Sequence, residues 1–286
     1  MAFKIENYYY KKYLYKPFLM PLKLYLKKHI LQLKIVNIVD KFNEYSPASA
    51  GSSKQQADIT IHNINNFSIQ VEELLKNLNH NIDIVDIEKT FKTNKSLVKE
   101  IKDSFIRNKA SKNEYLYSIY SFIKKNTEIN NVLEVGMGTN NQNIISHMDA
   151  DYIPGGSLRA FRDFFPKATI YGADVDKDIL FQENRIKTFF IDQTDFDLCE
   201  SAIKSKNVTF DLVIDDGLHS TFANLSIINA TINYLSVGGW IVIEDISPFS
   251  LRHWKIISVI FQSSKFKCYI APSTTDSYLF LLNRLK

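Results

Sequence analysis

The chain has 286 residues and a formal net charge of +4; 45% of its residues are hydrophobic and 23% are charged. This balance is typical of a globular protein and argues against collagen-like, disordered and integral membrane classes. So small a net charge also argues against a protein that binds nucleic acid mainly by neutralising phosphates. The two cysteines lack metal-ligand spacing, so we expect free buried thiols in a reducing compartment and a cytoplasmic protein.

The positive charge is concentrated at the N-terminus. Residues 1–34 contain eight lysines and one acidic residue, Glu6, so this stretch carries +7 and the rest of the chain −3. We expect residues 1–45 to form a basic arm that packs on the body or on a second copy of the chain in a homo-oligomer. Peripheral contact with an anionic membrane surface is the alternative, although Pro17 and Pro21 interrupt any long amphipathic helix. The arm has no apolar run long enough for a signal sequence or a membrane span.

Beyond the arm the chain divides into three further regions. Residues 46–58 are rich in small and polar side chains and are typical of a linker or mobile loop. Apolar residues then recur at helical spacing, which predicts a helical auxiliary region over residues 59–128. From residue 129 to 286 short apolar runs alternate with helix-like stretches, which predicts an α/β domain. The predicted strands lie at residues 131–136, 169–174, 187–192, 210–216, 238–245 and 277–285.

Several of the predicted strands are nearly all apolar, as in residues 132–135, 212–215 and 241–244. Such strands are typical of a mostly parallel sheet whose two faces are both covered by helices. Ligands of these sheets bind beyond the carboxyl ends of the strands, where this sequence places glycine or acidic residues. These strand-end residues are Gly136, Asp174, Asp192, Asp215, Asp216, Glu244 and Asp245.

A short glycine loop follows the first predicted strand. Gly136 and Gly138 let the backbone turn sharply and come close to a ligand. The third glycine of a dinucleotide-binding loop is missing, which counts against a nicotinamide dehydrogenase. The next helix is expected to begin near Ser157, a candidate N-cap, and to stop at Pro166.

Residues at the ends of the second and third strands predict contacts to a ribose and an adenine. Asp174 is placed to accept hydrogen bonds from ribose hydroxyls, because a carboxylate offers two acceptor oxygens on one rigid group. Asp192 and Gln193 could meet an adenine ring, with the carboxylate accepting from the exocyclic amine. Each acid alone could instead cap a helix, but the ordered set favours a ligand site.

The most informative pattern joins two strand ends. Asp215, Asp216 and His219 follow the fourth strand, and Glu244 and Asp245 end the fifth. Adjacent strands would bring these groups together, and three or more carboxylates stay ionised side by side only if a positive charge neutralises them. Hard oxygen ligands suit Mg²⁺ or a similar divalent cation. His219 is then a candidate general base, with a surface histidine among capping acids as the alternative.

These segments resemble class I S-adenosylmethionine-dependent methyltransferases, specifically the metal-dependent sugar O-methyltransferases. The resemblance covers residues 131–247 and is carried by LEVGMGTN, GGSLRAFRDFFPKATIYGADVD, RIKTFFIDQTD, FDLVIDDGLHS and GGWIVIEDI. The pairing of DDGLH with IED is its most specific part. The resemblance implies a Rossmann-like class I methyltransferase sheet that uses S-adenosylmethionine and Mg²⁺ as cofactors.

The resemblance also implies roles for individual residues. Around S-adenosylmethionine it places Glu134, Gly136, Gly138, Asp174, Asp192, Gln193 and Asp215. The Mg²⁺ ligands that it implies are Asp216, Glu244 and Asp245, with His219 as the catalytic base. The expected reaction is an in-line transfer to a sugar hydroxyl of a glycan precursor or glycosylated small molecule, after His219 has removed the hydroxyl proton.

Other functions stay open beside this hypothesis. A nucleic-acid methyltransferase would usually carry a [DN]PP[YF] turn or a Pro-Cys nucleophile, and neither occurs, so we expect no nucleic-acid partner. Another small-molecule acceptor, or a non-catalytic module that retains the fold, is a further alternative. The region before residue 131 and the loop at residues 140–154 do not match the resembled enzymes, so the acceptor and a lid role for this loop are left open.

Overall fold

The computed structural model describes residues 66–67, 69–78, 80, 83–262, 265–274 and 276–286. The predicted basic arm and linker lie outside the described residues, so membrane contact and homo-oligomerisation through the arm stay predictions. The chain divides into two compact units, residues 1–71 and 72–286, and the fold and site below belong to the second unit. In the part of the chain that the structure describes, no helix is both long and apolar enough to cross a lipid bilayer.

Helices α4 (Ile87–Thr90), α5 (Lys95–Arg107) and α6 (Glu114–Asn126) lead into the sheet. Each begins after a side chain that accepts a hydrogen bond from a backbone amide of the first turn, and this satisfies donors that have no partner within the helix. The three capping residues are Asp86, Asn94 and Asn113.

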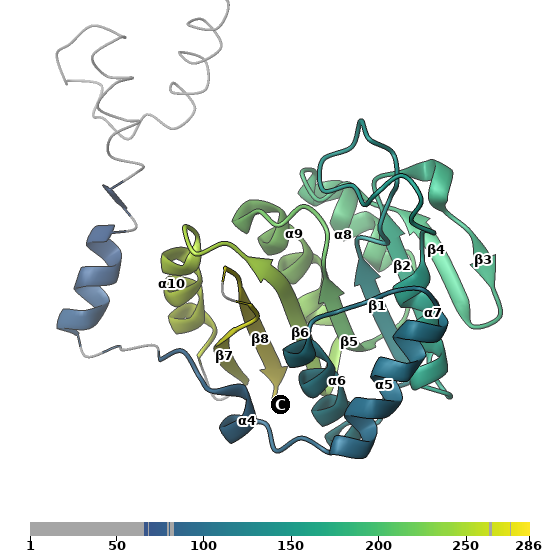
Figure 1. Ribbon diagram of the computed structural model, residues 1–286. Helices are drawn as coiled ribbons and strands as arrows, with labels where there is room; N and C mark the ends of the chain where they lie inside the picture. The colour runs from purple at the N-terminus through teal and green to yellow at the C-terminus, as the bar shows by residue number, and fades with distance from the viewer. Residues whose placement is uncertain (1–65, 68, 79, 81–82, 263–264, 275) are drawn as a thin grey trace, which may run out of the picture. The chain divides into compact units, whose positions relative to one another are not determined.

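The sheet has eight strands in the order β3-β4-β2-β1-β5-β6-β8-β7 (Figure 1). Its strands are β1 (Asn131–Val135), β2 (Thr169–Asp174), β3 (Gln182–Glu183), β4 (Ile186–Phe190), β5 (Phe210–Asp215), β6 (Leu235–Ile246), β7 (Phe266–Pro272) and β8 (Tyr278–Arg284). The five central strands from β4 to β6 are parallel, whereas β3, β8 and β7 pair antiparallel. The mostly parallel sheet is confirmed. The predicted strands did not include β3, which has two residues, or β7.

Helices cover both faces of the sheet (Figure 1). The remaining helices are α7 (Gly156–Phe164), α8 (Phe196–Lys204), α9 (Thr221–Thr231) and α10 (Leu251–Phe261), with short 3₁₀ turns at Lys177–Ile179 and Ile232–Tyr234. Val132 packs with α4 to α7 on one face, and its neighbour Leu133 packs with α8 to α10 on the other. This alternation explains why the strands are apolar throughout.

The helices before the sheet share the core of the α/β region. Phe105 of α5 and Tyr120 of α6 each pack edge-on against Phe161 of α7, with ring centroids 5.1 Å apart in both pairs. The predicted boundary at residue 128 therefore falls inside one packing unit. Cys199 and Cys268 are free and buried.

The predicted N-cap of α7 was wrong. The N-cap is Gly155, which has a φ of +77°, and Ser157 lies inside the first turn. A Cβ atom at Gly155 would lie 2.4 Å from the ring of Phe181, so position and conformation both require glycine. The hydroxyl of Ser157 is thereby free for a hydrogen bond elsewhere.

Candidate active site

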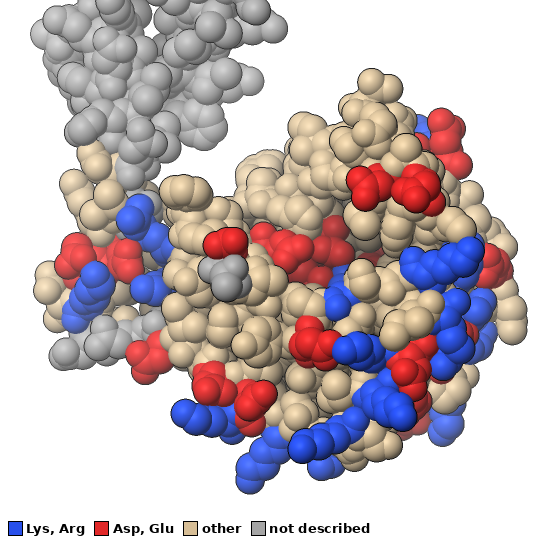
Figure 2. Space-filling view, viewed as in Figure 1, with Lys and Arg blue, Asp and Glu red and all other residues tan. Residues whose placement is uncertain are grey.

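A cavity of about 840 Å³ opens at the carboxyl edge of the parallel strands. Its walls come from the carboxyl ends of β1, β2, β4, β5 and β6, from the α5–α6 connection and from the loop before α7. Figure 2 shows acidic side chains gathered in a hollow at the centre of one face. The topology thus brings most of the predicted strand-end residues to one cavity, because carboxyl ends of parallel strands share one edge of the sheet.

The glycine loop after β1 is packed between two other loops. Gly136 has a φ of +89° and Gly138 a φ of +78°, a conformation that favours glycine. A Cβ atom on Gly136 would lie 2.3 Å from the backbone oxygen of Asp216, and one on Gly138 would lie 2.5 Å from the ring of Tyr152. Both glycines line the cavity and allow its walls to approach one another.

Asp174 lines the cavity at the end of β2 with its carboxylate held by the backbone. Oδ2 accepts a hydrogen bond from the amide of Met137 at 2.8 Å, and Oδ1 accepts one from the amide of Asp176 at 2.9 Å. Burial raises the pKa of Asp174. The carboxylate is fixed beside the glycine loop and keeps lone pairs that could receive ribose hydroxyls.

Asp192 and Gln193 line the cavity after β4, and both side chains are engaged within the protein. Oδ1 of Asp192 accepts from the amide and the hydroxyl of Thr194. Gln193 donates to Oδ1 of Asp215 at 2.8 Å and accepts from the amide of Leu218 at 2.9 Å. Gln193 therefore ties the end of β4 to the loop after β5, a structural role that the predicted adenine contact did not include.

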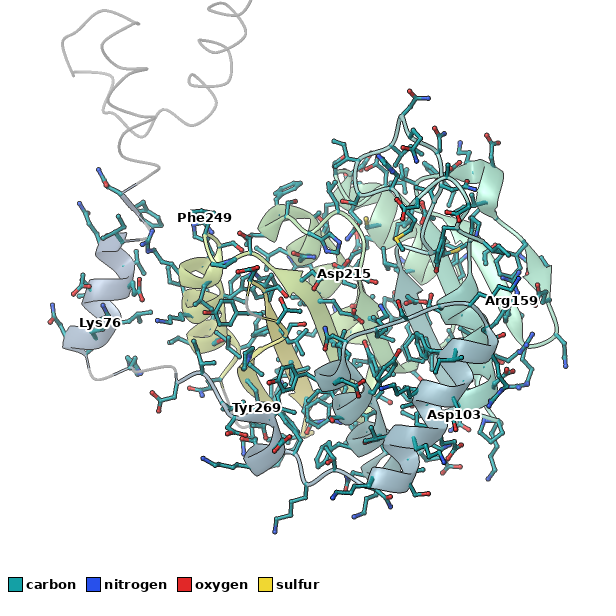
Figure 3. All side chains as sticks on the ribbon, in the orientation of Figure 1. Lys76, Asp103, Arg159, Asp215, Phe249 and Tyr269 are labelled. Atoms are coloured by element: carbon teal, nitrogen blue, oxygen red, sulfur yellow. The ribbon has the colours of Figure 1, made fainter. Side chains whose placement is uncertain are left out.

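Asp215, at the end of β5 (Figure 3), is fully buried and stands outside the set of described residues that line the cavity. Besides the bond from Gln193, its carboxylate accepts from Asn224 Nδ2 at 2.9 Å and from the amide of Gly217 at 3.3 Å. This geometry differs from the predicted contact with a cofactor. Because its acceptor capacity is used inside the protein, Asp215 anchors the loop that carries the next two site residues.

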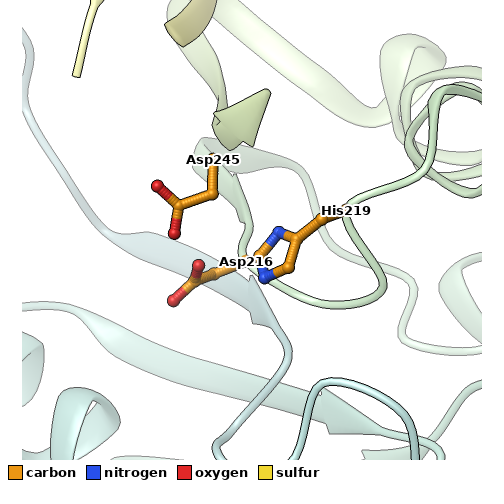
Figure 4. Close-up of side chains that lie close together, drawn as sticks. All are labelled: Asp216, His219 and Asp245. Atoms are coloured by element: carbon orange, nitrogen blue, oxygen red, sulfur yellow. The ribbon is translucent and has the colours of Figure 1, made fainter. Parts of the chain in front are cut away.

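Asp216, His219 and Asp245 form what we call the outer cluster (Figure 4). One ligand atom from each lies within 4.8 Å of the others. His219 and Asp245 have φ values of +55° and +50°, in the left-handed region that non-glycine residues adopt uncommonly. Nδ1 of His219 is buried and has no hydrogen-bond partner among the described residues. Two carboxylates and an imidazole with an unpaired nitrogen fit a divalent cation in chemistry and spacing.

Glu244 belongs instead to an inner cluster of Lys112, Glu134, Asp216 and Glu244, in which Asp216 is partly exposed and the other three are buried. Nζ of Lys112 lies 2.6 Å from Oδ2 of Asp216 and 2.9 Å from Oε2 of Glu244. Oε1 of Glu134 is 3.4 Å from the same nitrogen. The hydroxyl of Tyr120 donates to the second oxygen of Glu244. Donors of the protein therefore engage both oxygens of Glu244, an arrangement that differs from its predicted role as a direct Mg²⁺ ligand.

The inner cluster has perturbed pKa values. Burial, assisted by the charge of Asp216, raises the pKa of Glu244 to about 8. Burial raises the pKa of Glu134 to about 7 against the opposing effects of Lys112 and Ser157. Burial alone would lower the pKa of Lys112, but the three carboxylates together raise it well above its ordinary value. Perturbations of this kind are typical of functional sites.

Glu134 is fully buried and lies behind the cavity wall. Its Oε2 accepts a hydrogen bond from the hydroxyl of Ser157 at 2.6 Å. Its Oε1 receives no hydrogen bond from any residue that the structure describes and faces the ammonium of Lys112. Glu134 is outside the set of described residues that line the cavity, so its contact with S-adenosylmethionine stays a prediction.

Known proteins that resemble this chain carry O-methyltransferase names. No protein-family model matches the chain. It is 34% identical over 122 residues to demethylmacrocin O-methyltransferase of Streptomyces fradiae, covering 43% of this chain and 28% of that protein. It is 38% identical over 91 residues to mycinamicin VI 2''-O-methyltransferase of Micromonospora griseorubida, covering 32% of this chain and 23% of that protein. The chain therefore matches between 23% and 28% of the length of these relatives.

A solved structure decides the fold. MycE methyltransferase, crystallised with Mg, SAH and mycinamycin VI, superimposes with a TM-score of 0.51 at 22% identity, over 65% of this chain and 54% of that chain. The fold is that of the class I methyltransferases. The resemblance to sugar O-methyltransferases and the predicted Rossmann-like fold are thereby confirmed.

Two residues of the candidate site were not predicted from the sequence. Lys112 lies in the short connection between α5 and α6, and Tyr120 lies on the buried face of α6. Both belong to the helical region that precedes the first matching motif. A lysine near the start of an amphipathic helix reads as a solvated side chain, so only the packing of α5 and α6 against the sheet reveals its contacts.

The loop that precedes α7 in the methyltransferase fold is tied to the glycine loop. The amide of Gly155 donates to the carbonyl of Met137 at 2.9 Å, and the amide of Met148 donates to the carbonyl of Thr139 at 2.7 Å. Ile144, Ile145 and Met148 of this loop line the cavity. Its position beside the cavity is compatible with the lid role left open above, which stays a hypothesis.

Proposed function

We propose that this protein is an S-adenosylmethionine-dependent and Mg²⁺-dependent O-methyltransferase. The acceptor would be a sugar hydroxyl of a glycosylated small molecule or of a glycan precursor. The observation that carries the proposal is that Asp216, His219 and Asp245 converge in the same cavity as the glycine loop. The acceptor class is supported by the names of the relatives, which specify demethylmacrocin and mycinamicin VI as the compounds that those enzymes methylate.

The residues around the cavity fit S-adenosylmethionine. Gly136 and Gly138 leave the backbone open, and Asp174 presents a fixed carboxylate to ribose hydroxyls. Asp192 lies at the edge where an adenine would be received, and Gln193 holds the loop after β5 beside it. When bound, the cofactor supplies an electrophilic methyl group on a sulfonium. A cavity of about 840 Å³ leaves room for an acceptor beside it.

The outer cluster fits a divalent cation. Asp216 and Asp245 would hold it through carboxylate oxygens, and Glu244 lies directly behind them in the inner cluster. When bound, Mg²⁺ supplies positive charge that favours the ionised form of an acceptor hydroxyl. His219 would accept the hydroxyl proton, since its imidazole lies close to the two carboxylates. The acceptor oxygen would then attack the methyl carbon in line while the bond from that carbon to the sulfonium sulfur breaks and S-adenosylhomocysteine leaves. Much of the rate would come from positioning.

Titration calorimetry with S-adenosylmethionine, in Mg²⁺ and in EDTA, tests this function first. We expect micromolar binding, followed in a panel of glycosylated acceptors by turnover that EDTA abolishes. Failure to bind in both conditions would refute the methyltransferase function. Binding without turnover on any acceptor in Mg²⁺ would favour a non-catalytic module that retains the fold.

Gly136→Ala is expected to lower the affinity for S-adenosylhomocysteine at least about tenfold and to destabilise the fold by about 2 to 5 kcal/mol. The added Cβ would be strained at a φ of +89° and would overlap the backbone of the loop after β5. Gly238→Ala is the matched control, because Gly238 has a φ of +81° and open space around it. Calorimetry and urea unfolding measure both effects. Equal losses in the two variants would show that strain alone, not the approach of the loops, is responsible.

A further inference from the structure

The inner cluster contains a lysine whose charge is almost completely buried. The side chain of Lys112 is 6% exposed, and its ammonium contacts one carboxylate from each of β1, the loop after β5, and β6. The nearest oxygens belong to Asp216, at 2.6 Å, and Glu244, at 2.9 Å. Three strand ends that are far apart in the sequence thus meet at one cation.

The backbone around Lys112 is fixed on both sides of the residue. The amide of Lys112 donates to the hydroxyl of Tyr117 at 2.8 Å. The neighbouring Asn113 caps α6 through its Oδ1 and donates from Nδ2 to the hydroxyl of Ser273 at 2.7 Å. These hydrogen bonds fix the backbone from which the side chain of Lys112 extends to the carboxylates.

Burying several carboxylates together is unfavourable unless a positive charge compensates them. Glu134 and Glu244 are 0% and 1% exposed, so water cannot screen their charges. Within the described part of the chain, Oε1 of Glu134 has no hydrogen-bond partner, and it lies 3.4 Å from the ammonium of Lys112. The lysine stands at the inner side of Asp216, and His219 and Asp245 stand at its outer side.

We propose that Lys112 is a positioning residue, a built-in counter-ion that keeps the acidic centre assembled before a divalent cation binds at the outer cluster. The inference rests on the proposed function for the identity of that cation. Lys112 compensates the inner carboxylates, and this fixes Asp216 with one oxygen turned inward. The ammonium would repel a divalent cation at the outer cluster, so Lys112 also weakens the binding of that cation.

Lys112→Met tests the proposal because methionine keeps the length of the side chain without its charge. In EDTA we expect the melting temperature of the variant to fall by about 6 to 15 °C, as for a broken buried ion pair in a chain of this size. Mg²⁺ should restore more than half of that loss and should bind the variant at least about tenfold more tightly than the wild type. Differential scanning calorimetry and titration calorimetry with MgCl₂ measure the two effects.

Three further variants separate charge from packing. Lys112→Arg keeps the charge and should retain most of the stability in EDTA. The double variant Lys112→Met with Glu244→Gln removes one buried charge of each sign and should be more stable in EDTA than Lys112→Met alone. If Lys112→Met does not fold, recovery of folding in the double variant tests the same point. Lys102→Met is the control, because Lys102 forms an exposed ion pair with Glu114 and should show a small change that Mg²⁺ does not alter.

The results distinguish this proposal from the proposed function. If Lys112→Met lost the same stability in Mg²⁺ as in EDTA and the double variant gave no recovery, Lys112 would be a packing residue and the proposal would be overturned. If the wild type bound neither Mg²⁺ nor S-adenosylmethionine, the proposed function would fail. In that case recovery of stability in the double variant would still support the counter-ion role, and its absence would refute it.

Discussion

Replacing His219 with alanine is expected to lower turnover about 10³-fold, a typical contribution for a general base. The affinity for S-adenosylhomocysteine should stay within about twofold, because the residues placed around the cofactor lie on other strand ends. The loss of turnover is expected because the imidazole lies with Asp216 and Asp245 in the outer cluster and, among the described residues, its buried Nδ1 has no hydrogen-bond partner. Steady-state turnover on an acceptor identified in the panel, together with calorimetry, measures the two quantities.

His253→Ala is the control for this experiment, because His253 is an exposed residue of α10 outside the cavity. It should leave both turnover and affinity unchanged. Near wild-type turnover of His219→Ala on the true acceptor would mean that another group removes the proton. A large loss of Mg²⁺ affinity in His219→Ala would instead identify the imidazole as a metal ligand, which the spacing of the outer cluster also permits.

Asp216→Asn is expected to have the second large effect, a loss of Mg²⁺ affinity of about 10-fold to 100-fold together with a comparable loss of turnover. Asp216 is the one residue that belongs to both clusters, with Oδ2 on Lys112 and a carboxylate facing His219 and Asp245. Asparagine keeps the shape but removes the charge, so it weakens the outer cluster and leaves Lys112 with one partner fewer. Titration with MgCl₂ and the Mg²⁺ dependence of turnover measure the effect.

Asp197→Asn is the matched control, because Asp197 is exposed in the first turn of α8. It should bind Mg²⁺ no differently from the wild type. Unchanged Mg²⁺ affinity in Asp216→Asn would exclude Asp216 as a ligand and would contradict the proposed metal site. The two variants are also separable from each other, since His219→Ala should spare metal binding and Asp216→Asn should not.

Local sequence patterns at the strand ends predicted part of the fold and of the candidate site. The apolar runs with glycine or acidic ends predicted a mostly parallel sheet and most of the residues that line the cavity. This worked because parallel strands align their carboxyl ends whatever the rest of the chain does. The expected adjacency of the fourth and fifth strands likewise predicted that His219 and the acidic residues at their ends would come together, and the structure places ligand atoms of Asp216, His219 and Asp245 within 4.8 Å of one another.

Tertiary structure alone decided which acidic residues are engaged inside the protein and which face the cavity. Asp215 and Asp216 are neighbours in sequence. The buried carboxylate of Asp215 accepts hydrogen bonds from Gln193 and Asn224, whereas Asp216 lines the cavity. Successive residues at a strand end point in opposite directions, so a motif cannot assign both the same role without knowledge of what packs on each face. Glu244 was assigned as a ligand from its motif, but its hydrogen-bond partners come from α6 and the α5–α6 connection.

The sequence by itself predicted the class of the fold and the edge of the sheet at which the candidate site residues gather, because both follow from periodicity and from the alignment of parallel strand ends. Only the tertiary structure decided that Lys112 and Tyr120 belong to the site, 132 and 124 residues before Glu244. The physical reason is that charge compensation acts through space. A buried carboxylate needs a partner within a few ångströms, and which part of the chain supplies that partner depends on how the helices pack against the sheet.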